Sequence, residues 1–200
     1  KFELGMAVSK LYDFIWDDFC DWYIELAKIR MNGADEESAD SARRVLVWTM
    51  SNTLKLLHPF MPYITEEIWQ TLPHDGEALI VAKWPEYDEA LSFPQEAKDL
   101  ENVMALIRAI RTRRNEMNVP PSKKAHIYID TAHPAPYEEA SEFIARLAYG
   151  SKVEIGTGFD VQGAVTAVTD DAKALLPMDD LVDKAAETAR LNKELGNAQK

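Results

Sequence analysis

The chain has 200 residues, of which 46% are hydrophobic and 28% are charged, and its net charge is −12 at neutral pH. This composition indicates one large or two small globular units and excludes a disordered chain. No apolar run reaches the roughly 18 residues that a transmembrane helix needs, so we expect no membrane partner and a cytoplasmic location. Cys20 is the only cysteine, which excludes a disulfide framework and a multi-cysteine zinc site built from this chain.

The first part of the chain has the apolar spacing of long helices. Apolar residues recur at every third or fourth position over residues 2–31, which predicts a helix with a wide apolar face. Asn32-Gly33 is expected to end this helix. An acidic loop is expected over residues 35–40, and a second helix over residues 41–57.

Residues 54–69, LKLLHPFMPYITEEIW, contain two prolines three positions apart and predict a fixed corner between two packed helices. Pro59 is expected to move His58 out of the helical region of φ and ψ. Pro62 suits the first turn of a third helix, which should run to about Leu72. The corner indicates architecture, and it predicts no chemical task for its histidine or its glutamates.

The hydrophobic period changes from helical to alternating after Pro120-Pro121, which is the strongest domain-boundary signal in the chain. Before it, a fourth helix is expected from about residue 92 to residue 118. After it, we expect strands at 125–130, 153–155, 164–169 and 172–176, with one helix over 137–149. The predicted fold is mainly α, with an antiparallel helical bundle over residues 1–119, a small α/β subdomain over residues 120–178 and the start of a C-terminal coiled-coil helix over residues 179–200.

The chain has none of the common motifs of catalytic or metal sites. A glycine-rich phosphate loop, an HExxH pair and a GxSxG turn are all missing from the sequence. The four histidines show no metal-ligand spacing, and a structural role is the commoner one for isolated histidines. We therefore predict no catalytic residue, no metal site and no cofactor in these 200 residues.

Residues 108–124 form a basic segment, which carries six Lys and Arg residues against Glu116 alone and has a net charge of +5 in an acidic chain. Guanidinium and ammonium groups at this density suit phosphates. An equally good interpretation is a cationic helix end that complements its own dipole and pairs with the acidic first helix. Arg114 falls on the apolar stripe of its helix, where its stem can pack while the guanidinium leaves the core. The candidate phosphate-binding residues are Arg108, Arg111, Arg113, Arg114, Lys123 and Lys124.

A second candidate surface is aromatic. Trp16, Phe19, Trp22 and Tyr23 lie within eight residues of the first predicted helix. Such a cluster is typical of platforms on which RNA bases stack, and also of ordinary cores. Because their spacing places them on or beside the apolar stripe, packing is the favoured interpretation.

Three segments together are specific for a known family. FCDWYIELAK (19–28), the corner LKLLHPFMPYITEEIWQTLP (54–73) and IRAIRTRRNEMNVPPSKK (107–124) resemble, in order and spacing, the helical anticodon-binding domain of the aminoacyl-tRNA synthetases for valine, isoleucine, leucine and methionine. The α/β unit followed by a charged helix is most similar to the valyl branch, in which that helix continues into a coiled coil that touches tRNA.

The resemblance implies that tRNA is a partner, that the six candidate cations contact it, and that the corner and Trp22-Tyr23 serve as scaffold. It also implies a catalytic domain in the same polypeptide, which would use ATP to attach valine to tRNA. The family's catalytic signatures HIGH and KMSKS, its editing domain and the helix that normally precedes Phe2 have no counterpart here. The segment itself should therefore be inactive as a ligase.

Two alternatives are open. One is the same domain of a sister synthetase, most plausibly the isoleucyl enzyme, whose bacterial forms often end in a cysteine-rich zinc module. The other is a helical protein-interaction module, which would bind its partner through an exposed apolar face with little dependence on salt. A steep salt dependence of binding would favour the tRNA interpretation over the second alternative.

Overall fold

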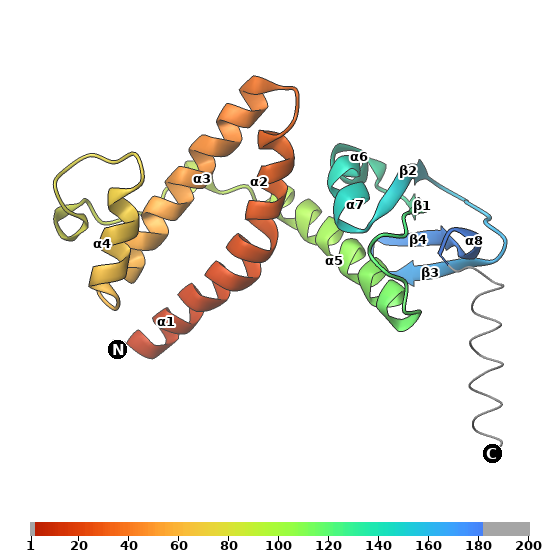
Figure 1. Cartoon of the computed structure of the whole chain (residues 1–200), viewed down its shortest axis with the longest axis horizontal. Helices are drawn as coiled ribbons and strands as arrows, with labels where there is room; N and C mark the ends of the chain where they lie inside the picture. The colour runs from red at the N-terminus through yellow and green to blue at the C-terminus, as the bar shows by residue number, and fades with distance from the viewer. Residues whose placement is uncertain (1–2, 182–200) are drawn as a thin grey trace, which may run out of the picture. The chain divides into compact units, whose positions relative to one another are not determined.

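The computed structural model describes residues 3–181. Its contacts divide the chain into two units, of which the first ends at Ser92 and the second begins at Phe93. The described part of the first unit contains helices alone, whereas the second unit combines helices with a four-stranded sheet (Figure 1). The chain is therefore mainly α with a small α/β part, as the sequence predicts.

The first helix is continuous from Leu4 to Met31, and its middle ten residues are π-helical. Phe14 and Ile24, where the helix type changes, both keep helical dihedral angles, so the chain continues without a break. The predicted apolar face is buried only in its second half, because α1 contains no buried residue. The three parts are α1 (Leu4–Asp13), η1 (Phe14–Tyr23) and α2 (Ile24–Met31).

The second long helix, α3 (Glu36–Leu57), contacts α2 and begins five residues earlier than predicted. The expected acidic loop over residues 35–40 is wrong, because Asp35 is an N-cap: its carboxylate accepts hydrogen bonds from the backbone N–H of Glu37 (3.1 Å) and Ser38 (3.2 Å). Glu36 and Glu37 then stabilise the first turn through the helix dipole.

The proline corner is present, and it leads into α4 (Pro62–Gln70). The expected shift of His58 is wrong, since this residue keeps helical angles (φ −52°, ψ −40°). The turn closes after it, where the N–H groups of Phe60 and Met61 both donate to the carbonyl of Leu57. Nδ1 of His58 lies 2.8 Å from the hydroxyl of the buried Thr65, and this contact holds α3 to α4.

The second unit begins with α5 (Pro94–Glu116), which packs against the sheet. The sequence alone groups this helix with the preceding three, because the change of period at Pro120-Pro121 is the boundary signal that a sequence offers. Contacts group it instead with the strands that follow, so the antiparallel bundle over residues 1–119 stays a prediction. The buried residues of α5 are Val103, Leu106, Ile107, Ile110 and Arg114.

The sheet has the strand order β2-β1-β4-β3, in which β1 pairs parallel with β2 and antiparallel with β4, and β4 pairs antiparallel with β3. The predicted helix over 137–149 is two short helices, because Ala140 (φ −91°, ψ 7°) interrupts it. α5 contacts β3 and β4, while α6 and α7 contact β2, so these helices form one layer on the sheet (Figure 1). The elements are β1 (Ala125–Thr131), α6 (Pro134–Glu139), α7 (Ser141–Leu147), β2 (Gly150–Gly156), β3 (Ala164–Val168), β4 (Ala172–Pro177) and α8 (Met178–Leu181); short 3₁₀ turns in the first unit are η2 (Leu79–Val81) and η3 (Glu89–Leu91).

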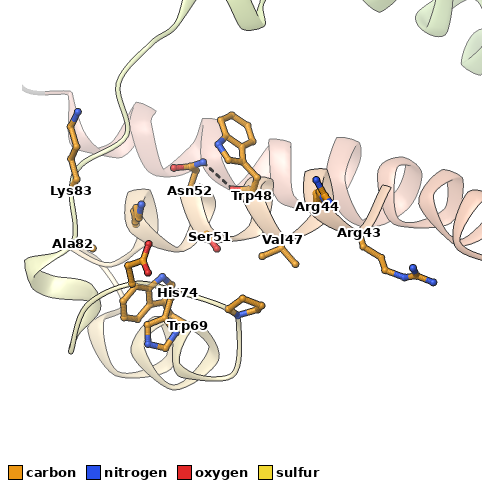
Figure 2. A pocket seen from close by; sticks show the side chains of 13 residues that line it. Arg43, Arg44, Val47, Trp48, Ser51, Asn52, Trp69, His74, Ala82 and Lys83 are labelled. Carbon is orange, nitrogen blue, oxygen red and sulfur yellow. Dashed lines mark hydrogen bonds between the residues drawn. The ribbon is translucent and has the colours of Figure 1, made fainter. Parts of the chain in front are cut away.

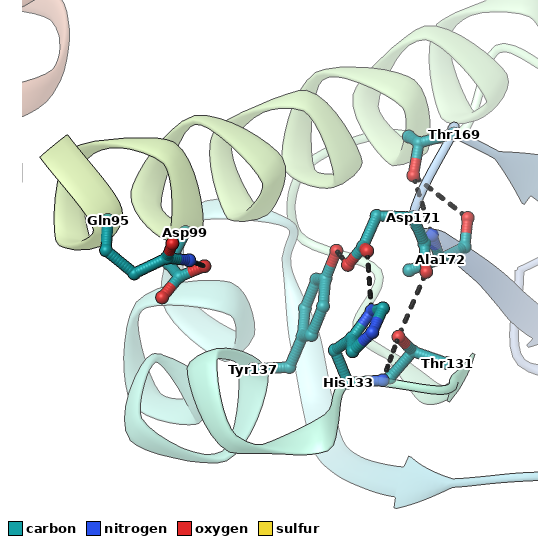
Figure 3. Close-up of polar contacts among 8 residues, drawn as sticks. All are labelled: Gln95, Asp99, Thr131, His133, Tyr137, Thr169, Asp171 and Ala172. Atoms are coloured by element: carbon teal, nitrogen blue, oxygen red, sulfur yellow. Dashed lines mark hydrogen bonds and ion pairs between the residues drawn. The ribbon is translucent and has the colours of Figure 1, made fainter.

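The turn between β3 and β4 is tied to the far end of β1 through Asp171 (Figure 3). Its carboxylate accepts a hydrogen bond from the Tyr137 hydroxyl (2.8 Å) and lies 3.0 Å from Nδ1 of His133. The Thr131 hydroxyl donates to the backbone carbonyl of Asp171 (2.9 Å). The predicted coiled-coil arm over residues 179–200 lies outside the described residues, except for residues 179–181.

Candidate nucleic-acid interface

The basic segment begins on α5 and continues through the turn that follows it. Asn118 ends the helix in the left-handed region (φ 53°), and the N–H of Val119 donates to the carbonyl of Arg114 (2.9 Å). Val119 is buried, so the chain folds back over the end of α5 before it enters β1. The two lysines of the segment therefore stand on a turn whose backbone is held in place.

Arg114 is the residue that holds this turn. Its side chain is only 2% exposed, and its Nη2 donates to the carbonyls of Pro120 (3.2 Å) and Lys123. The guanidinium carbon lies 5.4 Å from the centre of the Tyr149 ring. Burial lowers the pKa of Arg114, and Tyr149 opposes this shift. The expectation that this guanidinium leaves the core is wrong, because the folded turn supplies carbonyl partners inside it.

Arg111 is half-buried and is turned toward α7. Its Nε donates to the carbonyl of Leu147 (2.6 Å), and its guanidinium carbon lies 5.9 Å from the Tyr149 ring centre. A cation at the last carbonyl of a helix satisfies an acceptor that has no partner within the helix, and it also complements the helix dipole. Arg111 and Arg114 therefore both stabilise the fold next to one tyrosine, Tyr149.

The other four candidates are exposed. Arg113 forms a surface ion pair with Glu116 of the same helix at 2.9 Å, which contributes at most about 1 kcal/mol and leaves the guanidinium accessible. Lys123 and Lys124 extend from the turn that Arg114 fixes, and the N–H of Lys123 donates to the carbonyl of Pro120 (3.1 Å). The exposed candidates are Arg108, Arg113, Lys123 and Lys124.

The structure adds a further cation that the sequence did not suggest. Arg146 is exposed in the last turn of α7, and its neighbour Leu147 accepts the hydrogen bond from Arg111. No local signal could have found it, because 36 residues separate Arg111 from the carbonyl that it contacts. Arg146 therefore comes near Arg111 only through the packing of α7 against α5.

Most of the aromatic cluster belongs to the core of the first unit. Phe19 and Trp22 are buried, and Tyr23 is half-buried. Burial raises the pKa of the Tyr23 hydroxyl, and the charge of Arg30 opposes this shift. Trp16 is 53% exposed, so among these four aromatics it presents the most accessible ring.

Within residues 3–181, no three His, Cys, Asp or Glu side chains gather in a way that could hold a metal ion. Across the same residues, every helix is too short or too polar to cross a membrane. The exposed side chains of the basic segment carry mainly positive charge, which suits a polyanion.

Comparison with known proteins identifies the family. Residues 1–129 match the family model for the anticodon-binding domain of tRNA ligase. The chain belongs to this family. The match covers both the first helices and the whole basic segment of this anticodon-binding domain.

The chain also has closely similar curated relatives. It is 43% identical over 195 residues to a valine–tRNA ligase of Bacillus licheniformis, a match that covers 96% of this chain and 22% of the relative. It is 43% identical over 199 residues to that of Geobacillus kaustophilus (98% and 23%) and 40% identical over 204 residues to that of Bacillus subtilis (100% and 23%). The chain thus spans less than a quarter of the length of these relatives.

Proposed function

We propose that this chain is the tRNA-binding part of a valine–tRNA ligase and that it holds the anticodon arm. The observation that carries the proposal is a family match over residues 1–129 together with identity of 40–43% to three valine–tRNA ligases over nearly the whole chain. The names of these relatives favour the valyl enzyme over the isoleucyl one. In the whole enzyme, a catalytic domain in the same polypeptide would attach valine using ATP, in the cytoplasm where translation occurs.

The proposed binding surface consists of the exposed cations Arg108, Arg113, Lys123 and Lys124. Each would contact backbone phosphates of tRNA, because exposed charges at fixed positions displace counterions from a polyanion. Such contacts set position and affinity, whereas unpaired bases must be read by other groups. Arg111 and Arg114 would act indirectly, since their side chains are engaged with backbone carbonyls and hold the surface in place.

The proposal can be tested with the triple variant Arg113→Ala, Lys123→Ala, Lys124→Ala. We expect weaker tRNA binding and a shallower dependence of log K on log salt, by about 0.7–0.9 for each phosphate that the variant no longer neutralises. Lys98→Ala is the matched control, since Lys98 is an exposed cation on the same helix, paired with Glu101 at 3.7 Å. A triple variant with the affinity and salt slope of the control would refute the proposed surface.

A further inference from the structure

The first unit contains a groove of its own, lined by residues 43–83. It has a volume of about 740 Å³ and runs between α3 and the chain that follows α4 (Figure 2). Seven residues from Arg43 to Lys55, spaced so that they share one side of α3, form one wall. Trp69 and His74 lie across from α3, and Val47 and Ser51 extend toward them; Lys83 also lines the groove.

The groove is preformed, because its second wall is anchored to the core. Leu54, Trp69 and Leu79 form a buried cluster beneath it. The Glu66 carboxylate accepts a hydrogen bond from the N–H of Leu79 (2.8 Å) and another from the Gln70 amide (2.8 Å). The same amide donates to the carbonyl of residue 77 (3.0 Å). This segment is therefore held at a set position beside α3.

The groove concentrates positive charge in an acidic unit. Residues 1–92 contain eight Lys and Arg residues against 17 Asp and Glu residues. Four of those eight cations line the groove, namely Arg43, Arg44, Lys55 and Lys83, whereas Asp75 is its one lining carboxylate among the described residues. Three of the four are in exposed ion pairs with neighbouring carboxylates, which compete weakly with a ligand. Lys55 has no such pair with any residue in the described range.

Two exposed tryptophan side chains line the groove and a hollow next to it. Trp48, on α3, is 56% exposed and lines the groove. A second hollow of about 390 Å³ shares Lys55 and Ala82 with the groove and is lined by Trp84, which is 55% exposed. The two hollows therefore share one lysine, and each is lined by one exposed tryptophan. Exposed tryptophans near cations are the usual platform for stacked bases in proteins that bind single strands.

We propose that this groove binds a short single-stranded RNA segment, whose bases stack on Trp48 and Trp84 while a phosphate between them contacts Lys55. This inference rests on the proposed function, because it takes RNA to be the partner. A ligand that joins flat apolar groups through negatively charged links matches both features of the groove. An acidic peptide would match the cations alone and leave the two rings without a partner.

The test uses the 200-residue chain and a fluorescently labelled oligouridine of ten nucleotides, whose binding is followed by anisotropy. We expect Trp48→Ala, Trp84→Ala and Lys55→Glu each to weaken binding at least about fivefold. Tyr87→Ala and Lys10→Glu are matched controls, since Tyr87 is an exposed aromatic and Lys10 an exposed cation, and neither lines either hollow. Thermal unfolding checks that each variant is folded. We expect all of them to fold, because none of the replaced side chains is buried.

Two competitors separate the classes of ligand. An abasic phosphodiester of the same length carries the same charge without rings, and we expect it to compete much more weakly than oligouridine. Equal competition by the abasic chain, or by a ten-residue oligoglutamate, would overturn the proposal and point to a nonspecific anion or an acidic protein segment.

The outcome for the groove can be told apart from that for the basic segment. Variants of Trp48, Trp84 and Lys55 that bind oligouridine like the wild-type chain overturn the groove proposal. If the triple variant of Arg113, Lys123 and Lys124 still loses affinity in the tRNA-binding experiment, the proposed function stands without the groove. A chain whose tRNA binding responds to neither set of changes would contradict both.

Discussion

In the second unit, cations that are neighbours in the sequence differ in exposure. In the first unit, cations up to 40 positions apart in the sequence line one groove. Arg113 and Arg114 are adjacent, yet one is exposed and paired on the surface while the other is buried against two carbonyls. In the first unit, Arg43 and Lys83 line one groove because Leu79 anchors its segment beside α3. Charge density along a sequence is therefore a poor measure of charge density on a surface, because helix rotation and turns redistribute side chains.

The largest effect should come from the inward-facing cation of the second unit. Arg114→Ala is expected to lower the free energy of unfolding by about 2–4 kcal/mol, because it opens a cavity, leaves the Lys123 carbonyl without this donor and removes one of the two hydrogen bonds to the Pro120 carbonyl. Urea unfolding measures this change. Arg113→Ala is the matched control, and it should stay within about 0.5 kcal/mol of the wild-type value.

Equal effects of the Arg113 and Arg114 substitutions would contradict the division into inward and outward cations. Arg114→Met sharpens the same contrast. Methionine keeps most of the packed stem and removes a charge whose Nε and Nη1 have no hydrogen-bonding partner within residues 3–181. It should therefore cost less stability than alanine.

A smaller effect is expected at Tyr137, the inward-facing phenol of the second unit. Burial, and then the hydrogen bond to Asp171, raise the pKa of Tyr137 above its ordinary value of 10.0. Tyr137→Phe should cost about 1–2 kcal/mol at neutral pH, because it removes a hydrogen bond to a carboxylate. Urea unfolding at pH 7, 9 and 10.5 measures the cost.

The raised pKa of Tyr137 also sets the sign of the pH dependence. The unfolded chain releases the phenol proton near pH 10 and the folded chain only at higher pH, so this stabilisation is complete below about pH 10 and is lost as the pH rises further. The wild type should therefore approach the variant in stability above that pH. Tyr128→Phe is the control, since no hydrogen bond of its hydroxyl is found in the described chain, and a parallel pH response of the two variants would refute the role of Asp171.

The smallest effect should come from Glu66, the anchor of the groove in the first unit. The hydrogen bond from Gln70 and then that from the N–H of Leu79 lower the pKa of Glu66 below its ordinary value of 4.5, against partial desolvation. A depressed pKa in the folded state means that the stabilisation is present above about pH 4.5 and is lost as the pH falls through the folded-state pKa.

Glu66→Gln should accordingly melt below the wild-type temperature at pH 6, and this difference should shrink at pH 3.5. Glu67→Gln is the matched control, because Glu67 is an exposed carboxylate at the next position. Melting curves at the two pH values measure the difference in melting temperature between each variant and the wild type. A difference for Glu66→Gln that does not change with pH would show that its carboxylate is not the anchor.

Helical spacing and proline positions were sufficient to predict α4 and α5, and alternation was sufficient to predict β1, because these signals come from residues within one element. The start of α3 was missed although Asp35, Glu36 and Glu37 carried a local capping signal. The break between α6 and α7 at Ala140 had no comparable signal, since alanine favours helix.

The sequence by itself determined the family, the helical and strand periods, and which cations exist. Only the tertiary structure decided which of those cations are accessible: Arg114 is buried because carbonyls six and nine positions along the chain, and the Tyr149 ring between α7 and β2, lie against its guanidinium. It also decided that Trp48 and Trp84 line two hollows that share Lys55, because the buried Leu79 and its hydrogen bond to Glu66 hold the segment after α4 in place. Periodicity is a property of neighbours along the chain, whereas exposure depends on what the rest of the fold brings against them.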